Sequence, residues 1–396
     1  MRFAFILSAV CGLLGGLSLP ARATTPDVLE KLNIDSERLG AIRRIVAEGI
    51  RSGEMPGAVV LVRYRGETIF HEAFGQRQVT PVLEPMTTDT IFDLASLTKP
   101  VCTATCIHLL MERGELSPDT LVSSWIPDFG QRGKHPITVK HLLTHQSGLV
   151  PDNALSDYAD GPKVAFDKIH ALPLWKPIGE QFAYSDVNFL VLGELVEEIS
   201  GMPLDAFARK EIFAPLGMRD TMFTPASELI PRIAPTARSG KEVLRGIVHD
   251  PRAQALGGIA GHAGLFSTAE DLARFADMVI QQGRIGEKQL FKPGSIALMV
   301  APQPVSSGIR SLGWDKQSPY SSNKGDLLSD QAIGHGGFTG TVLWIDPAQE
   351  LTVVFLSSRL HPDGKGSVNP LAGRIATVAA AALPPRTATA ANSSRQ

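Results

Sequence analysis

The sequence is poor in cysteine, and the few cysteines present do not predict a disulfide framework. Three occur in 396 residues, and Cys11 lies inside an N-terminal apolar run. Cys102 and Cys106 are four residues apart in an expected helix, a spacing that suits a disulfide poorly. We therefore expect two buried thiols in a helix.

Basic clusters are also missing, which excludes one class of partner. Lys and Arg number 38 against 40 Asp and Glu, without a basic stripe. Nothing therefore predicts binding to a nucleic-acid backbone. A hydrophobic content of 43% is enough for a large core and argues against disorder.

Several nucleotide and hydrolase motifs are absent as well. The sequence has no Gly-x-Ser-x-Gly elbow, no Walker loop and no dinucleotide fingerprint. His141 and His145 have helical spacing, but Leu142 stands where a zinc peptidase carries its glutamate. We expect no metal and no cofactor.

The two ends of the sequence differ from the rest. Arg2 precedes an apolar run over residues 3–19, and Ala21 and Ala23 supply small residues. This pattern predicts a signal peptide over residues 1–23, cleaved after Ala23, in a periplasmic or secreted protein without integral membrane association. Residues 384–396 are rich in Ala, Thr and Ser, which predicts a disordered tail.

The alternation of strand-like and helix-like segments predicts a mixed fold over residues 24–383. Residues 57–64 and 67–74 predict a hairpin that turns at Arg65 and Gly66, and residues 341–346 and 351–356 predict a second one. Helices are expected over residues 138–145, 185–200, 268–282 and 371–383. This order fits an α/β (α+β) lobe built from both chain ends, with a mostly helical lobe inserted between them.

Ser96 and Lys99 are the leading catalytic candidates. They precede a run from Pro100 to Gly114 that has no interior glycine or proline, which predicts a helix. A serine and a lysine three apart lie on one helix face, where the amine can take or relay the hydroxyl proton. A base must be largely neutral, so we expect burial and a neighbouring cation to lower the pKa of Lys99.

A second Ser-x-x-Lys copy, Ser321 to Lys324, has a different setting. It lies among Ser, Pro, Asn and Gly residues, with no apolar helix behind it. Its composition predicts a surface loop rather than a catalytic turn.

With these residues in view, the sequence resembles the superfamily of serine β-lactamases, penicillin-binding proteins and related esterases, especially the branch of class C β-lactamases and family VIII-type esterases. The family's second motif, Tyr-x-Asn, is matched by Tyr184-Ser-Asp186, with Tyr158 as a weaker competitor. Asp186 replaces the asparagine, and either Asn188 or Asp186 could fill its role; a helix N-cap is an equal alternative for Asp186.

The third motif is matched best by His335-Gly-Gly337, which leads into the second hairpin. His262-Ala-Gly264 also fits, but it leads toward a helix. His335 replaces the family's commoner lysine and so removes a permanent cation from the place where β-lactams present a carboxylate. We therefore expect weak β-lactamase activity.

The resemblance implies an antiparallel sheet flanked by helices and an acyl-enzyme mechanism without a cofactor. The substrate would be a small ester or amide, with D-amino-acid compounds and peptidoglycan fragments as leading classes. A β-lactamase or D,D-carboxypeptidase is the alternative, and a non-catalytic cell-wall-fragment binding protein is the alternative of another class. The residues that would form the site are the catalytic Ser96, Lys99 and Tyr184 and the oxyanion or substrate-binding Phe338, His335, Gly336, Gly337, Asp186 and Asn188.

Overall fold

The structure, a computed structural model, describes residues 26–239, 242–364 and 366–385. The expected signal peptide, its cleavage after Ala23 and nearly all of the expected C-terminal tail lie outside these residues. None of the helices in the described ranges is both long and apolar enough to cross a membrane.

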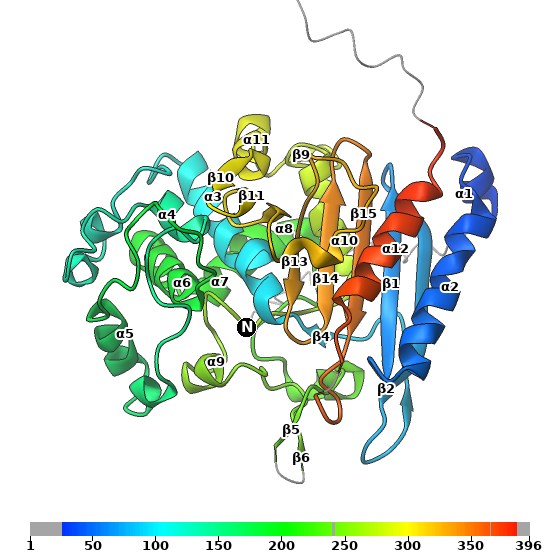
Figure 1. Ribbon diagram of the computed structural model, residues 1–396, viewed down its shortest axis with the longest axis horizontal. Coiled ribbons are helices and arrows are strands. Elements are labelled where there is room, and N and C mark those ends of the chain that lie inside the picture. Colours follow the sequence, from blue (N-terminus) through cyan, green and yellow to red (C-terminus); the bar gives the residue numbers. More distant parts are fainter. Residues whose placement is uncertain (1–25, 240–241, 365, 386–396) are drawn as a thin grey trace, which may run out of the picture.

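A nine-stranded antiparallel sheet forms the centre of the molecule (Figure 1). Its order is β10-β11-β12-β13-β14-β15-β1-β2-β3, so strands from the two chain ends meet in the middle. Leu61 of β1 pairs with Val354 of β15, so the two predicted hairpins lie side by side in one sheet. The strands of the sheet are β1 (Gly57–Tyr64), β2 (Glu67–Gln78), β3 (Glu84–Pro85), β10 (Gln303–Val305), β11 (Gly308–Arg310), β12 (Asp315–Gln317), β13 (Ile333–Gly337), β14 (Thr341–Asp346) and β15 (Leu351–Ser357).

Short two-stranded pairs lie outside this sheet. They are β4 (Phe92–Asp93) with β7 (Phe266–Ser267), β5 (Arg238–Ser239) with β6 (Glu242–Val243), and β8 (Arg284–Ile285) with β9 (Lys288–Gln289).

Helices cover both faces of the sheet. In Figure 1, α2 and α12 lie side by side over one face, and α4, α5 and α6 lie in a helical lobe at the left of the view. The helices are α1 (Pro26–Lys31), α2 (Ser36–Arg51), α3 (Thr105–Glu112), α4 (Val139–Leu143), α5 (Pro162–His170), α6 (Asp186–Ser200), α7 (Leu204–Ala208), α8 (Ala214–Leu216), α9 (Pro251–Ala255), α10 (Ala269–Ile280), α11 (Pro293–Val300) and α12 (Asn369–Ala381).

The central strand β1 is buried along its whole length because it belongs to two cores. Val60 and Val62 pack in the core under α2 and α12, whereas Val59 and Leu61 pack in the larger core with the helical lobe. A strand buried on both faces reads as a continuous apolar run, which explains the sequence of β1.

The expected helices are present, and one is shorter than predicted. Ser185 caps α6, and Gly201 ends it in the left-handed conformation. In contrast, α4 stops at Leu143, and His145 follows with a φ of +57°. His141 and His145 therefore do not share a helix face, because the left-handed turn rotates His145 away toward α6.

Candidate active site

Ser96 lies on a tight turn between β4 and the helical lobe. The turn is a 3₁₀ segment, η1 (Ala95–Leu97), and Ala95 has the left-handed φ of +45°. The Asp93 carboxylate fixes this turn by accepting from the Ala95 N–H at 2.9 Å. A helix does follow, as predicted, but its first part, η2 (Lys99–Ala104), is a π-helical turn before α3. Ser96 is consequently partly exposed, while Lys99 is buried.

Three oxygen atoms surround the Lys99 ammonium. Its Nζ donates to Ser96 Oγ at 3.0 Å and to the backbone carbonyl of His262 at 2.9 Å. Asp186 Oδ1 lies 2.7 Å away and forms an ion pair with it. The amine therefore connects the serine to a carboxylate inside a buried site.

The charge state of Lys99 differs from the sequence-based expectation. Burial opposes the charged form, but the nearby Asp186 carboxylate and the Tyr184 hydroxyl outweigh it and raise the pKa of Lys99. The expectation of a lowered pKa was wrong, because the Asp186 carboxylate is the charge in direct contact with the amine. Lys99 is a charged donor to Ser96 in the free protein.

Tyr184 is the tyrosine that faces this pair, whereas Tyr158 lies elsewhere. Lys99 Nζ is 5.2 Å from the centre of the Tyr184 ring. Burial raises the pKa of Tyr184 even though the Lys99 charge opposes that shift. Tyr158 instead donates to Asn153 at 2.7 Å.

The two candidates for the family's asparagine position separate clearly. Ser185 is the N-cap of α6, so the carboxylate of Asp186 is free to contact Lys99. Asn188 is buried between Ser147 and the carbonyl of Leu142. Asn188 therefore supports α4 against α6, and of the two side chains it is Asp186 that contacts Lys99.

Strand β13 brings the third motif beside the nucleophile turn. A Cβ at Gly337 would collide with the Leu94 carbonyl and the Thr341 hydroxyl, so only glycine allows this approach. Thr341 Oγ1 also donates to the Leu94 carbonyl at 3.0 Å. The end of β13, followed by Phe338, is thereby held against the turn that carries Ser96.

His335 is buried in the cavity wall and carries no charge near neutral pH. Burial, together with the nearby Arg310 and Lys99, lowers its pKa to about 3. Its ring centre lies 5.9 Å from that of Tyr184. This agrees with the expectation that His335 does not supply a permanent cation.

His262 and Asp250 belong to the site, but the sequence analysis did not identify them as site residues. His262 supplies the carbonyl that receives Lys99, and its Nε2 lies 2.9 Å from Asp250 Oδ1. A Cβ at Gly261 would collide with the Phe189 carbonyl of α6, so this loop packs directly on the helix. The match of His262-Ala-Gly264 to a family motif was the available signal, and it was set aside in favour of His335.

Asp186, Asp250 and His262 bring carboxylate and imidazole atoms within 4.8 Å of one another. Such a set could hold a metal ion by donor type. The Lys99 ammonium already lies 2.7 Å from Asp186, so the group has an internal cation.

The site opens into a cavity of about 300 Å³. Its lining includes Ser96 and Tyr184, the cationic Arg359 and the polar Asn323 and Asn369. The full lining is Ser96, Tyr184, Asp315, Tyr320, Asn323, His335, Gly336, Gly337, Phe338, Arg359, Gly366, Ser367 and Asn369. The cavity therefore suits a small substrate with a polar or anionic end.

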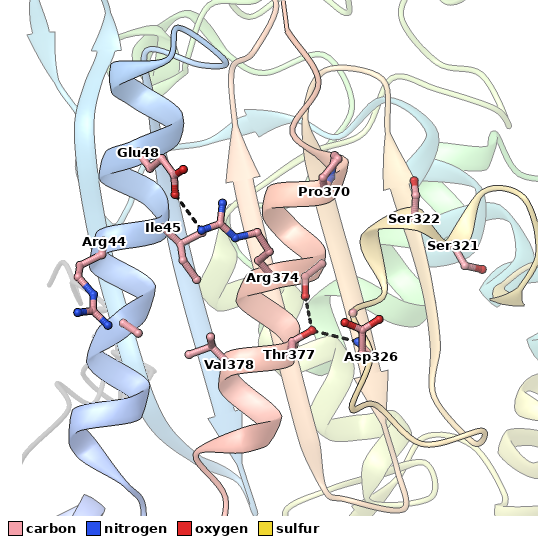
Figure 2. Close-up of a pocket in the computed structure, with 13 residues that line it drawn as sticks. Arg44, Ile45, Glu48, Ser321, Ser322, Asp326, Pro370, Arg374, Thr377 and Val378 are labelled. Atoms are coloured by element: carbon pink, nitrogen blue, oxygen red, sulfur yellow. Dashed lines mark hydrogen bonds and ion pairs between the residues drawn. The ribbon is translucent and has the colours of Figure 1, made fainter.

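The second Ser-x-x-Lys copy lies at the rim of a different groove, shown in Figure 2 between α2 and α12. Ser321 Oγ donates to Asp315 Oδ2 at 2.7 Å, and Lys324 Nζ lies over the Trp344 ring at 5.7 Å. This serine and lysine do not form a pair like Ser96 and Lys99. The segment is nevertheless not a plain surface loop, because Asn323 is buried and accepts from Trp344.

Comparison with protein families gives one model that spans most of the chain. It is described as Beta-lactamase and matches residues 42–377. The matched part includes every residue of the site described above.

Individual relatives are similar over nearly the whole chain. A protein of Escherichia coli (strain K12) with the provisional name D-alanyl-D-alanine carboxypeptidase is 31% identical over 369 residues, covering 84% of this chain and 85% of that protein. An N-acetylmuramyl-L-alanine amidase of Bacillus subtilis (strain 168) is 30% identical, covering 84% and 83%. The crystal structure of a penicillin-binding protein homologue from Caulobacter crescentus superposes with a TM-score of 0.71 at 22% identity, covering 88% of this chain and 98% of that one.

Proposed function

The chain belongs to the beta-lactamase family and is a serine hydrolase, and from this premise we propose that Ser96 forms an acyl-enzyme with small amides or esters derived from the cell wall. The observation that carries the proposal is the contact of Lys99 Nζ with Ser96 Oγ, 3.0 Å long, at the wall of a cavity. A nucleophile within hydrogen-bond reach of a proton-transfer group is the basic requirement of covalent catalysis.

The proposed reaction begins with attack of Ser96 Oγ on the substrate carbonyl carbon. The serine proton passes into the group formed by Tyr184, Lys99 and Asp186, and from there to the leaving nitrogen or oxygen. Because Lys99 is charged in the free enzyme, it can accept this proton only after passing its own to the Asp186 carboxylate, which lies 2.7 Å away. Water then attacks the acyl-serine by the same route in reverse and releases the acid.

The negative charge on the carbonyl oxygen needs donors in the first step. The backbone N–H groups of Ser96 and Phe338 are proposed for this role. Support comes from Gly337 and Thr341, which hold the end of β13 against the backbone at Leu94. Gly336 leaves room for the Asn323 amide, which lines the same cavity.

The proposed substrate class rests on the cavity and on the relatives. Two relatives that match more than four-fifths of this chain are named for hydrolysis of cell-wall amide bonds. The cavity of about 300 Å³ is large enough for a short peptide fragment or a small acyl compound. Such substrates would meet this enzyme outside the cytoplasm, in line with the proposed export of the chain in periplasmic or secreted form.

D,D-carboxypeptidase activity is the second candidate, and Arg359 favours it. Arg359 lines the cavity, where it lies over the exposed Phe338 ring at 4.7 Å. Its guanidinium could donate hydrogen bonds to the terminal carboxylate of a peptide. Efficient β-lactam hydrolysis is not proposed, since His335 is uncharged.

Intact-mass spectrometry of wild type and Ser96→Ala tests the proposal. Each protein is treated with a fluorophosphonate and, separately, with penicillin, while turnover of a short nitrophenyl ester, a cephalosporin and a D-alanyl-D-alanine peptide is followed. We expect a fluorophosphonate adduct and ester turnover in wild type only, with slow turnover of the cephalosporin.

The peptide distinguishes the two candidates, because its cleavage would favour the carboxypeptidase. Adducts that persist in Ser96→Ala would contradict the choice of nucleophile. A wild-type protein without adduct or turnover would favour a non-catalytic binding protein.

A further inference from the structure

Arg310, in strand β11, is a buried cation whose hydrogen-bonding capacity is largely unused. Its side chain is 0% exposed. Nη1 makes one long contact of 3.4 Å with Asp315 Oδ1, and Nε and Nη2 have no partner among the described residues. A guanidinium carries five N–H donors, so this burial leaves most of its charge uncompensated.

Such an arrangement destabilises the fold. Burying a charged group without full pairing costs free energy, and an apolar side chain of similar size is often better tolerated. Asp315 does not need Arg310, because its carboxylate also accepts from the Lys316 N–H at 3.0 Å and from Ser321 Oγ at 2.7 Å. Stability therefore gives no reason for an arginine at this position.

The guanidinium lies against a chain of aromatic rings that leads to Tyr184. It is 5.4 Å from the centre of the Phe182 ring, which packs edge-on against Tyr320. Tyr320 stacks on Tyr184 at 4.9 Å. On its other side, Tyr184 stacks on His145 at 4.5 Å.

The charge of Arg310 acts on the polar groups near these rings. After burial, Arg310 is the strongest influence that lowers the pKa of His335 and of His145. Asp315, Tyr184 and Tyr320 in turn favour the charged form of Arg310, although burial lowers its pKa overall. The groups around the guanidinium are therefore Asp315 of β12, Tyr320 of the turn after β12, His335 of β13, and Tyr184 and His145 beside α6.

We propose that Arg310 is a positioning residue of the acyl-transfer site, whose fixed charge lies against the aromatic rings that pack on Tyr184 and supports the negative charge that develops around Ser96 and Tyr184. This role rests on the proposed acyl-enzyme mechanism. Lys99 provides positive charge 5.2 Å from the centre of the Tyr184 ring, and Arg310 provides a second buried charge that interacts with Tyr184. His335 also lies in the cavity wall, but it is uncharged and so provides no positive charge.

The experiment compares wild type with Arg310→Met, Arg310→Lys and the control Arg374→Met. Arg374 lies on α12 in the groove of Figure 2, where it pairs with Glu48 at 2.8 Å and is exposed. Measured for each protein are the Tm, kcat and KM for a neutral nitrophenyl ester, and the pH profile of kcat/KM.

For Arg310→Met we expect an unchanged or higher Tm, because an uncompensated buried charge is removed. We also expect kcat to fall about ten-fold and the acidic limb of the profile to move about one unit to higher pH, since each pKa unit equals a ten-fold change. The sign follows because removal of a cation raises the pKa of the groups that must lose a proton. Arg310→Lys should keep the position of the limb, and Arg374→Met should match wild type.

For Arg310→Met, two results would overturn the proposal. A large loss of Tm with unchanged kcat would make Arg310 a structural residue. A raised KM with unchanged kcat and pH profile would make it a substrate-binding residue. If Arg310→Met does not fold, Arg310→Lys provides the test. A shift of its acidic limb by about one pH unit, the size expected for loss of the charge, would count against the role. The Tm comparison needs no turnover, so failure of the acyl-enzyme mechanism would appear separately in the Ser96→Ala adduct experiment.

Discussion

At the scale of single residues, the site depends on which charge contacts Lys99. The family's asparagine would offer a neutral amide, whereas Asp186 offers a carboxylate 2.7 Å from the amine. An opposite charge at this distance strongly favours the protonated amine. The free enzyme thus holds a charged lysine and an un-ionised serine, and proton transfer must begin from that state.

Replacement of Asp186 by asparagine tests this arrangement. Loss of the carboxylate lowers the pKa of Lys99 and also that of Tyr184, which Asp186 raises. We expect the acidic limb of the kcat/KM profile to move roughly one unit or more to lower pH in Asp186→Asn. The pH profile of ester hydrolysis is the measurement.

Asp152→Asn is the matched control for that variant. Asp152 is exposed and lies near Asp186 and Asp250, with Arg252 as its partner at 3.6 Å. It has no direct contact with Lys99, so its removal should move the limb much less. Equal shifts in both variants, or none in Asp186→Asn, would mean that the Lys99–Asp186 contact does not control the proton.

At the scale of elements, the site depends on two backbone segments that touch without intervening side chains. Strand β13 meets the backbone before Ser96 at Gly337, and the loop before His262 meets α6 at Gly261. Each contact brings a main-chain group to the reacting centre. The glycines are required because a Cβ would occupy the space of the opposing backbone.

Substitution of Gly337 by alanine should therefore displace the end of β13. We expect Gly337→Ala to lower kcat by about a hundred-fold, the size of effect seen when an oxyanion donor is lost. The comparison is Gly294→Ala on α11, where a Cβ would meet no atom within 4 Å. Steady-state kinetics and the Tm of both variants are measured, and near-wild-type turnover in Gly337→Ala would contradict the close approach.

At the scale of the whole molecule, two cores share the central strands of the sheet. Residues of β1 and β15 alternate between the core under α2 and α12 and the core of the helical lobe. Loss of packing in one core would disturb these strands and therefore the other core as well. We therefore expect the protein to unfold as one cooperative unit.

Truncations on opposite faces of the shared strands test this coupling. Leu61→Ala opens the larger core and Phe355→Ala opens the core under α2 and α12, each at a cost of about 2–5 kcal/mol. Calorimetry should show one transition in both variants, shifted to lower temperature. The exposed Leu83→Ala should change little, and two separate transitions would contradict a single unit.

The sequence by itself determined those features that depend on neighbours along the chain. The two hairpins, the caps of α6 at Ser185 and Gly201, the placing of Ser96 and Lys99 three residues apart, and the family resemblance are of this kind. Local backbone preference and side-chain periodicity are enough to predict them. The family and the fold are confirmed, whereas the roles of the site residues stay predictions.

Only the tertiary structure decided which distant groups meet at the site. It placed the His262 carbonyl and Asp186 around Lys99, buried Asn188 away from the cavity, and set Arg310 against the Phe182 ring. The physical reason is that a pKa depends on burial and on charges nearby in space, whatever their separation in sequence. A motif fixes which groups are present, and the packing of the lobes fixes which of them carry charge.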